Sequence, residues 1–288
     1  MPPRVQSSPS TGPGPGPGRL PAVALAAALI GALTASPRPA AASWPTPAAG
    51  ESASGDPELI ITLDDGPNPA TTEKILDTLA AHHASAVFFV VGWRLQRGDP
   101  GRIRTVLGRM LREGHVVANH SVNHLNLCGI AEDAVGPEID DSERLIREAI
   151  AMPVRWFRTP YGAHCNRLEA QLGARSLGHF HWDIDPQEWK YGSGKGAAAY
   201  VINRLKRLEG RAVLLMHDTK VATVIALPMI LDWIAAENAA RLARGGRPIR
   251  IVGGAELAAE QAASIIEFGR LAWADVLDLL GSAKQVLP

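Results

Sequence analysis

The sequence has few cysteines, no excess of either charge and few aromatic residues. Its two cysteines, Cys128 and Cys165, exclude a disulfide-rich scaffold but leave a single bridge open. The formal net charge is +0 at pH 7, and no basic stripe is interleaved with aromatic residues, which argues against a nucleic-acid partner. Hydrophobic residues make up 46% of the 288 residues, enough for one large domain with a substantial core.

The N-terminal region has the composition of an export signal. Arg4 and Arg19 precede or flank the apolar stretch LPAVALAAALIGALTA, and small residues follow before Ser43. Because a membrane-spanning helix needs ~20 apolar residues, we interpret residues 1–42 as a secretory signal peptide, with an uncleaved anchor as the alternative. Cleavage would leave 26 basic and 29 acidic residues and no stable membrane span. We therefore expect a secreted, periplasmic or envelope-associated monomer.

The rest of the chain divides into a linker and one folded domain. Residues 43–57 are rich in Pro, Ala, Ser and Gly and predict a flexible linker, and residues 58–288 predict the domain. The expected strands are 58–64, 86–91, 115–118, 154–157, 179–183, 212–216 and 249–252. The expected helices are 69–82, 101–113, 138–151, 197–208, 222–241 and 270–281. This alternation predicts an α/β fold, a distorted (β/α) barrel of about seven parallel strands.

Two adjacent carboxylates end the first expected strand. In ELIITLDDGPN a β-branched, apolar run leads to Asp64 and Asp65, and Gly66 and Pro67 then stop the strand. Asp, Gly and Pro are also typical of an ordinary turn. In a barrel, however, catalytic groups lie at the C-terminal ends of the strands. The polar residues after the other strands decide between these interpretations.

A histidine pair follows the third expected strand. His120 and His124 are four residues apart, a spacing that would place both imidazoles on one face of a helical turn, as metal binding requires. Ser121 stands where the zinc-protease pattern HExxH has its general base, and it is a poor proton acceptor. A third ligand and a base must therefore come from elsewhere, and Asp64 and Asp65 are candidates for one role each.

Three more strand ends carry polar side chains. RWFRTPYGAH contains Arg158, whose guanidinium can hold a carboxylate in its ionised form. HWDIDPQEW and LLMHD follow the fifth and sixth strands and contribute Asp185, Glu188, Trp189 and His217. Polar groups at five strand ends are a stronger indication of a catalytic site than any one of them alone.

The order TLDDGP, HSVNH, RTPYG, DPQEW and LLMHD resembles the five motifs of the polysaccharide deacetylases, carbohydrate esterase family four. The stretches AVFFVVG and GHVVANHS also resemble the second and third strands of that family, so the resemblance spans roughly residues 58–253. It implies that Asp65, His120 and His124 bind a divalent metal, usually Zn²⁺, with Co²⁺ or another divalent ion as alternatives. Asp64 would be the general base, kept ionised by Arg158.

The resemblance also implies the remaining roles. His217 would be the general acid, Leu215 and Trp189 would form the pocket for the acetyl methyl group, and the Tyr161 backbone N–H would help hold the oxyanion. One position departs from the family pattern, because Glu188 stands where Asp usually precedes the Trp of the fourth motif. Glu188 or Asp185 would then orient His217, or its orientation would be looser.

The implied function is a metal-dependent hydrolase that removes N-acetyl groups from a polysaccharide containing N-acetylglucosamine, such as peptidoglycan or a chitin-like polymer. An O-acetyl xylan esterase of the same fold is one alternative, and a catalytically weak, metal-containing carbohydrate-binding protein of the envelope is another. Two His and one carboxylate also describe the facial triad of non-haem iron oxygenases. Those enzymes usually have antiparallel double-sheet folds, whereas this chain alternates strands with helices.

Overall fold

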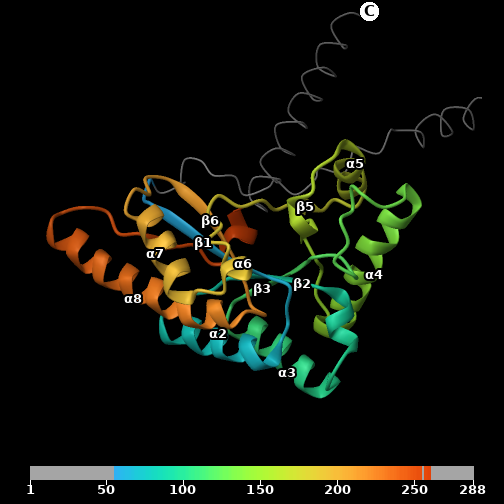
Figure 1. The fold of residues 1–288 in the computed structure, drawn as a ribbon, viewed down its shortest axis with the longest axis horizontal. Coiled ribbons are helices and arrows are strands. Elements are labelled where there is room, and N and C mark those ends of the chain that lie inside the picture. The colour runs from blue at the N-terminus through green and yellow to red at the C-terminus, as the bar shows by residue number, and fades with distance from the viewer. Residues whose placement is uncertain (1–54, 255, 261–288) are drawn as a thin grey trace, which may run out of the picture. The chain divides into compact units, whose positions relative to one another are not determined.

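The computed structural model describes residues 55–254 and 256–260 (Figure 1). The predicted signal peptide, residues 1–42, lies outside these described residues, as do most of the predicted linker and the predicted helix 270–281. The first strand of the described residues begins at Glu58.

A parallel sheet forms the centre of the domain. Its strands are β1 (Glu58–Asp64), β2 (Val87–Val90), β3 (Val116–Asn119), β4 (Trp156–Phe157), β5 (Gly178–His179), β6 (Arg211–His217) and β7 (Arg250–Ile251). They lie in the order β5-β4-β3-β2-β1-β6, and β7 pairs with the N-terminal end of β1. Every pairing between these strands is parallel, as the alternation of strands and helices predicted.

The sheet curls into a half-barrel, which confirms the predicted distorted (β/α) barrel. The chain after β5 returns to the opposite edge, where Ile184 forms a parallel bridge with Leu214 of β6. The Asp183 carboxylate adds a hydrogen bond from the Val213 N–H at 2.8 Å. The edge of the sheet next to β6 is therefore occupied by an irregular segment rather than by a full strand. The predicted strand 179–183 is correspondingly wrong in its extent, since β5 contains only Gly178–His179.

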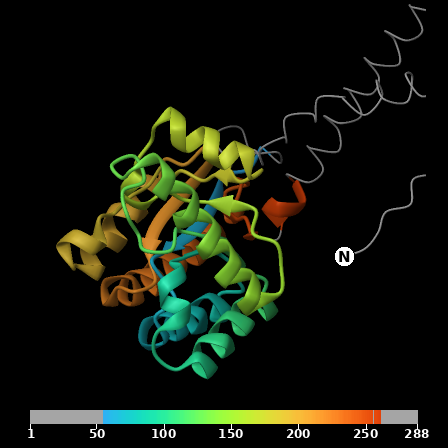
Figure 2. The same ribbon diagram turned by 90° about the vertical axis from the view of Figure 1, so that its right-hand side faces the viewer.

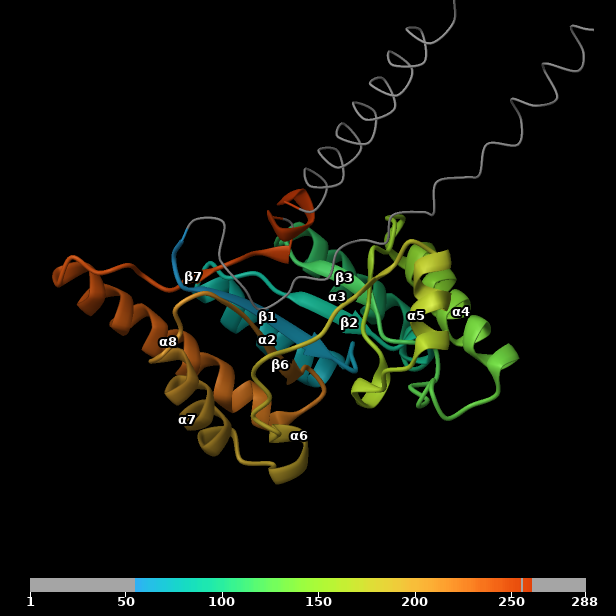
Figure 3. The ribbon, with the colours of Figure 1, turned by 90° about the horizontal axis from the view of Figure 1, so that it is seen from above.

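Helices pack around the sheet and its connecting segments. They are α2 (Pro69–Ala81), α3 (Pro100–Arg112), α4 (Glu132–Ile150), α5 (Asn166–Ala174), α6 (Glu188–Tyr191), α7 (Gly194–Leu205) and α8 (Val221–Ala243). In Figure 1, α2, α3 and α8 lie along one side of the strands, and Figure 2 shows the strands running through the middle of the domain. Figure 3 places α7 beside α8 at one end and α4 beside α5 at the other.

The sequence located most of these helices but missed two. Helix α4 begins at Glu132, six residues before the predicted start, because Pro137 lies within its N-terminal part rather than ahead of it. Helix α5 was not predicted, since only Leu168 and Leu172 anchor its nine residues. The four-residue helix α6 is too short for any period to be recognised.

Alternation along β1 separates two cores. Leu59, Ile61 and Leu63 face the helices and belong to the large outer cluster of buried side chains. Ile60 belongs to a smaller cluster inside the barrel, which includes Phe89, Trp156 and Phe180. Because side chains on a strand alternate with a period of two, Asp64 shares the inner face with Ile60. A carboxylate therefore ends the row of inward-facing side chains.

Among the described helices, only α8 is long and apolar enough to cross a membrane by length and composition. Its buried residues, among them Leu227, Ile230 and Leu231, pack within the outer core, and the helix contacts α7 and α2. This packing is typical of a core helix.

Cys128 and Cys165 form a disulfide bond. The bond joins the loop after β3 to the residue that precedes α5 and closes a sequence separation of 37 residues.

We expect Cys165→Ser to lower the free energy of unfolding by about 3 kcal/mol, because the unfolded chain loses a constraint. Denaturant unfolding without reductant measures this. Cys128→Ser should cost the same and the double variant no more, whereas additive losses would mean that the cysteines act independently.

Candidate active site

Strand register brings the first catalytic candidates together. Asp64, the last residue of β1, is aligned with His217, the last residue of β6. The following residue, Asp65, has φ 76°, a left-handed conformation that is uncommon for a residue with a side chain. The two adjacent acids therefore leave the strand in different directions.

The turn after Asp65 is held by a close approach of two chain segments. Asp218 accepts a hydrogen bond from the Thr72 hydroxyl at 2.6 Å, and its backbone N–H donates to the Asp64 carbonyl. A Cβ at Gly66 would lie 2.0 Å from the Asp218 carboxylate, so this position admits only glycine. Burial raises the pKa of Asp218 to about 7.

Asp64 is bound by a buried guanidinium. Nη1 of Arg158 lies 2.7 Å from Oδ1 of Asp64 and 2.7 Å from the Thr62 hydroxyl. Nε and Nη2 of Arg158 donate to the carbonyls of Phe180 and His181. Arg158 is 0% exposed, so its position inside the barrel is fixed from all sides. This pair uses Oδ1 of Asp64 and not Oδ2.

His120 is held in a defined orientation. Its Nδ1 lies 2.7 Å from the Arg158 carbonyl, which can only accept, so Nδ1 carries the proton and Nε2 is free. Nε2 lies 3.7 Å from Oδ1 of Asp65 and 3.6 Å from Oδ2 of Asp64. Burial lowers the pKa of His120, which favours the neutral form that ligates metals.

The second histidine comes from a loop and not from a helical turn. Ser121 and His124 have φ values of 66° and 57°, and the Ser121 hydroxyl accepts a hydrogen bond from the His124 N–H at 2.9 Å. The expected helical spacing is therefore wrong, although the imidazoles do meet, with their centroids 4.9 Å apart. Nε2 of His124 lies 3.2 Å from Oδ1 of Asp65.

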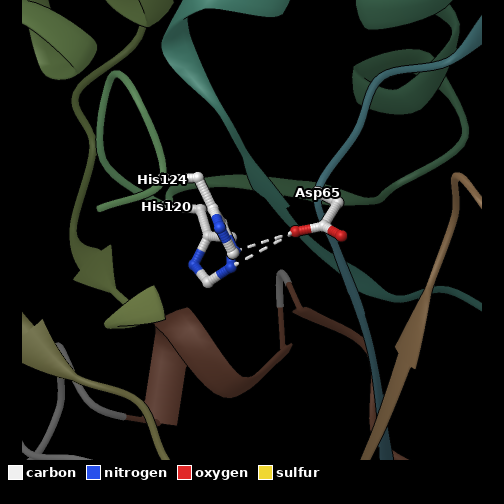
Figure 4. Close-up of side chains that lie close together, drawn as sticks. All are labelled: Asp65, His120 and His124. Carbon is white, nitrogen blue, oxygen red and sulfur yellow. Dashed lines mark ion pairs between the residues drawn. The ribbon is translucent and has the colours of Figure 1, made fainter. Parts of the chain in front are cut away.

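Asp65, His120 and His124 form a set of donors suited to a metal ion. Each offers one ligand atom, and these atoms lie within 4.8 Å of one another (Figure 4). Two imidazoles and one carboxylate match the donors that zinc and related ions prefer. Burial would raise the pKa of Asp65, but its hydrogen bond with His124 and its electrostatic interactions with His120, His217 and His124 lower it overall.

Glu188 orients His217. Oε1 of Glu188 lies 2.9 Å from Nδ1 of His217 and also accepts hydrogen bonds from the His217 N–H and the Thr223 hydroxyl. Asp185 instead accepts from the Gln187 N–H at 2.8 Å. The longer side chain thus reaches His217.

The pKa of His217 is raised by its surroundings. Burial lowers it, but the Glu188 hydrogen bond and the charges of Glu188, Asp64 and Asp65 raise it overall.

One cleft of about 390 Å³ is lined by Asp64, Asp65, His120, His124 and His217. The predicted residues Tyr161, Trp189 and Leu215 lie in its wall, and Asp185 joins them. Leu215 is buried, whereas Tyr161 and Trp189 are 71% and 48% exposed. Sequence reasoning missed Thr159, Trp182 and Lys220, which also line the cleft. Lys220 lies three residues after His217, and no motif marks it.

A model of the family described as polysaccharide deacetylase matches residues 51–179. The chain is 35% identical over 168 residues to a chitooligosaccharide deacetylase of Sinorhizobium fredii, covering 58% of this chain and 74% of that relative. It is 30% identical over 187 residues to a peptidoglycan-N-acetylglucosamine deacetylase of Bacillus cereus, covering 62% of this chain and 83% of that relative. The structure of the peptidoglycan deacetylase PdaC from Bacillus subtilis superposes with a TM-score of 0.61 and 28% identity, covering 76% of this chain and 98% of that one.

Proposed function

The chain belongs to the polysaccharide deacetylase family, a family of hydrolases, and on that premise we propose that it is a metal-dependent enzyme that removes N-acetyl groups from a polysaccharide containing N-acetylglucosamine. The observation that carries this proposal is that two adjacent acids have different partners. Oδ1 of Asp64 binds Arg158, whereas Oδ1 of Asp65 faces the two imidazoles. One acid is thus available as a base and the other as a ligand.

Asp65, His120 and His124 would hold the metal, which we propose is Zn²⁺. When bound, such an ion supplies Lewis-acid polarisation of the acetyl carbonyl, which is needed because amides are poor electrophiles. Three protein ligands leave a position open, as in catalytic zinc sites.

The proton path follows from the positions of Asp64 and His217. Asp64, whose Oδ1 is bound by Arg158, accepts a proton from the attacking water through Oδ2. The Tyr161 N–H donates to the oxygen that gains negative charge. Nε2 of His217, whose Nδ1 is held by Glu188, donates a proton to the departing amine. The products are acetate and a free amino sugar.

The identity of the polymer and the location of the enzyme are part of the proposal. The named relatives act on chitooligosaccharide or peptidoglycan, so a substrate with N-acetylglucosamine units is favoured. Leu215 and Trp189 present an apolar surface next to His217, which suits the acetyl methyl group. An export signal in residues 1–42 would bring the enzyme to such polymers in the cell envelope.

Acetate release tests the proposal. The zinc-loaded protein is incubated with chito-oligosaccharides, peptidoglycan fragments and acetylated xylan, and free acetate is measured. We expect release from an N-acetylated substrate and none after removal of the metal by a chelator. Release from xylan alone would favour the esterase, and binding of chito-oligosaccharide without release would favour the carbohydrate-binding alternative.

The pairing of His217 with Glu188 predicts a change in the pH dependence of kcat. A general acid must be protonated, so activity falls as the pH rises through the pKa of His217. Glu188 raises that pKa, and Glu188→Gln removes its charge. We therefore expect the alkaline limb of the pH profile to move to lower pH in Glu188→Gln.

Two further variants control this measurement. Glu188→Asp keeps the charge and should keep the alkaline limb nearer to that of the wild type than Glu188→Gln does. Glu237→Gln makes the same change on α8, where Glu237 pairs with Arg241, and should leave the profile as it is. An unchanged alkaline limb in Glu188→Gln would remove His217 as the general acid.

A further inference from the structure

A second cluster of possible metal ligands lies outside the cleft. It consists of His164 from the loop after β4, Glu169 on α5 and His179 at the end of β5. Nδ1 of His164 lies 3.1 Å from Oε1 of Glu169, and Nδ1 of His179 lies 2.6 Å from the same oxygen. One ligand atom from each residue lies within 4.8 Å of the others, as in the cluster around Asp65.

His179 offers a buried ring nitrogen to this second cluster. His179 is 5% exposed, and its Nε2 has no hydrogen-bond partner within the described part of the chain. The ring of His181 lies beside that of His179, with a centroid distance of 4.2 Å.

The surrounding fold holds the three residues in place. Leu168 and Leu172 anchor α5 in the outer core, which fixes Glu169 between them. His164 directly precedes Cys165, and the disulfide bond joins that residue to the loop after β3. The ligands are thus brought together by a short helix, a strand and a cross-linked loop. A site assembled from such constrained elements loses little conformational entropy when it binds an ion.

We propose that His164, Glu169 and His179 form a second metal site, separate from the cleft, for a divalent ion of the Zn²⁺, Ni²⁺ or Cu²⁺ class. Imidazole ligands favour these ions over Ca²⁺ and Mg²⁺, which prefer an all-oxygen shell. His164 and Glu169 are 58% and 38% exposed, so an ion reaches the site from solvent. Three ligands leave the fourth position of a tetrahedral ion to water.

The site acts on the loop that borders the cleft. His164 lies three residues after Tyr161, and His179 lies three residues before Trp182. Tyr161 and Trp182 both line the cleft. The two segments already touch, since a Cβ at Gly162 would lie 2.7 Å from the Trp182 ring. An ion bound by His164 and His179 would cross-link these segments and stabilise the arrangement of Tyr161.

Zinc stoichiometry tests the second site. The full chain is freed of metal with a chelator and titrated with Zn²⁺ by calorimetry, and bound zinc is counted by mass spectrometry. We expect two equivalents for the wild type, one for His164→Ala, one for His120→Ala and none for the double variant. His164 is exposed, so its substitution leaves the core intact. His82→Ala changes a histidine that pairs with Asp232 and belongs to neither cluster, and it should keep both equivalents.

A thermal measurement in the His120→Ala background adds a structural readout. Zinc should raise Tm of His120→Ala and should leave Tm of the double variant unchanged. Equal stoichiometry in the wild type and His164→Ala would overturn the second site. One equivalent in the wild type and none in His164→Ala would support the second site and contradict the metal in the cleft, so the two proposals fail separately.

Discussion

Asp64→Asn is expected to lower kcat/KM by about 1,000-fold while the metal at the cleft is retained, because positioned proton transfer contributes factors of this order. Asn has nearly the same shape as Asp but does not accept a proton at neutral pH. Asp65, His120 and His124, the proposed ligands, are unchanged in this variant. Loss of activity with full metal content would therefore separate the base from the ligand set.

The substitution also has a cost in stability that the experiment must account for. Arg158 is fully buried, and Asp64 is its only carboxylate partner among the ion pairs of the described residues. Removing one partner of a buried pair costs about 3–5 kcal/mol because the other charge is left uncompensated. The Thr62 hydroxyl and two backbone carbonyls still accept from Arg158, which reduces the loss. Activity must thus be measured well below Tm of the variant.

The measurement combines acetate release with metal analysis and circular dichroism of the same sample. Asp185→Asn is the matched control, because Asp185 lies in the same cleft but accepts a hydrogen bond from a backbone N–H and contacts no cation in the described structure. Its effect on kcat/KM should be much smaller. A folded Asp64→Asn that has lost its metal would make Asp64 a ligand, and one that stays active would remove it as the base.

The sequence predicted the parts of this site that depend on strand ends. Apolar, β-branched runs identified β1 and β6, and parallel pairing then required Asp64 and His217 to meet at one edge of the sheet. The absence of a base within the histidine pair indicates that Asp64 and Asp65 supply one role each, and the resemblance to the family implies which acid has which role. The alternation along β1 could also have identified Thr62, which lies on the same face as Asp64 and binds Arg158.

Features that depend on long-range packing could not be predicted. The partner of His217 is decided by whether a Glu side chain reaches across from α6, and both Glu188 and Asp185 were consistent with the sequence. The disulfide pairing depends on the path of the loop after β3. The cluster of His164, Glu169 and His179 requires α5, a helix too short to be recognised by its period. In each case the sequence contains the residues but does not give the distance between them in the fold.

His120→Ala is expected to abolish both metal binding at the cleft and acetate release. The ring of His120 is 3% exposed, and its hydrogen bond to the Arg158 carbonyl directs Nε2 toward Asp65. Only Asp65 and His124 then remain of the ligand set. Loss of a group that merely orients a ligand weakens metal binding by about 10–100-fold, so loss of the oriented ligand itself should weaken it further.

The comparison with Asp64→Asn is sharpest in a His164→Ala background, which removes the proposed second zinc site from the count. There, Asp64→Asn should contain one equivalent of zinc and His120→Ala none, although both release acetate far more slowly than the parent. His124→Ala should behave like His120→Ala but with a smaller loss of zinc, because His124 lies on a loop and its side chain is 26% exposed. Its position is therefore less constrained, and water can replace it at lower cost. If His120→Ala keeps its zinc in this background, the ion is not held by the imidazole that the fold orients most strictly, and the division of roles between Asp64 and Asp65 loses its basis.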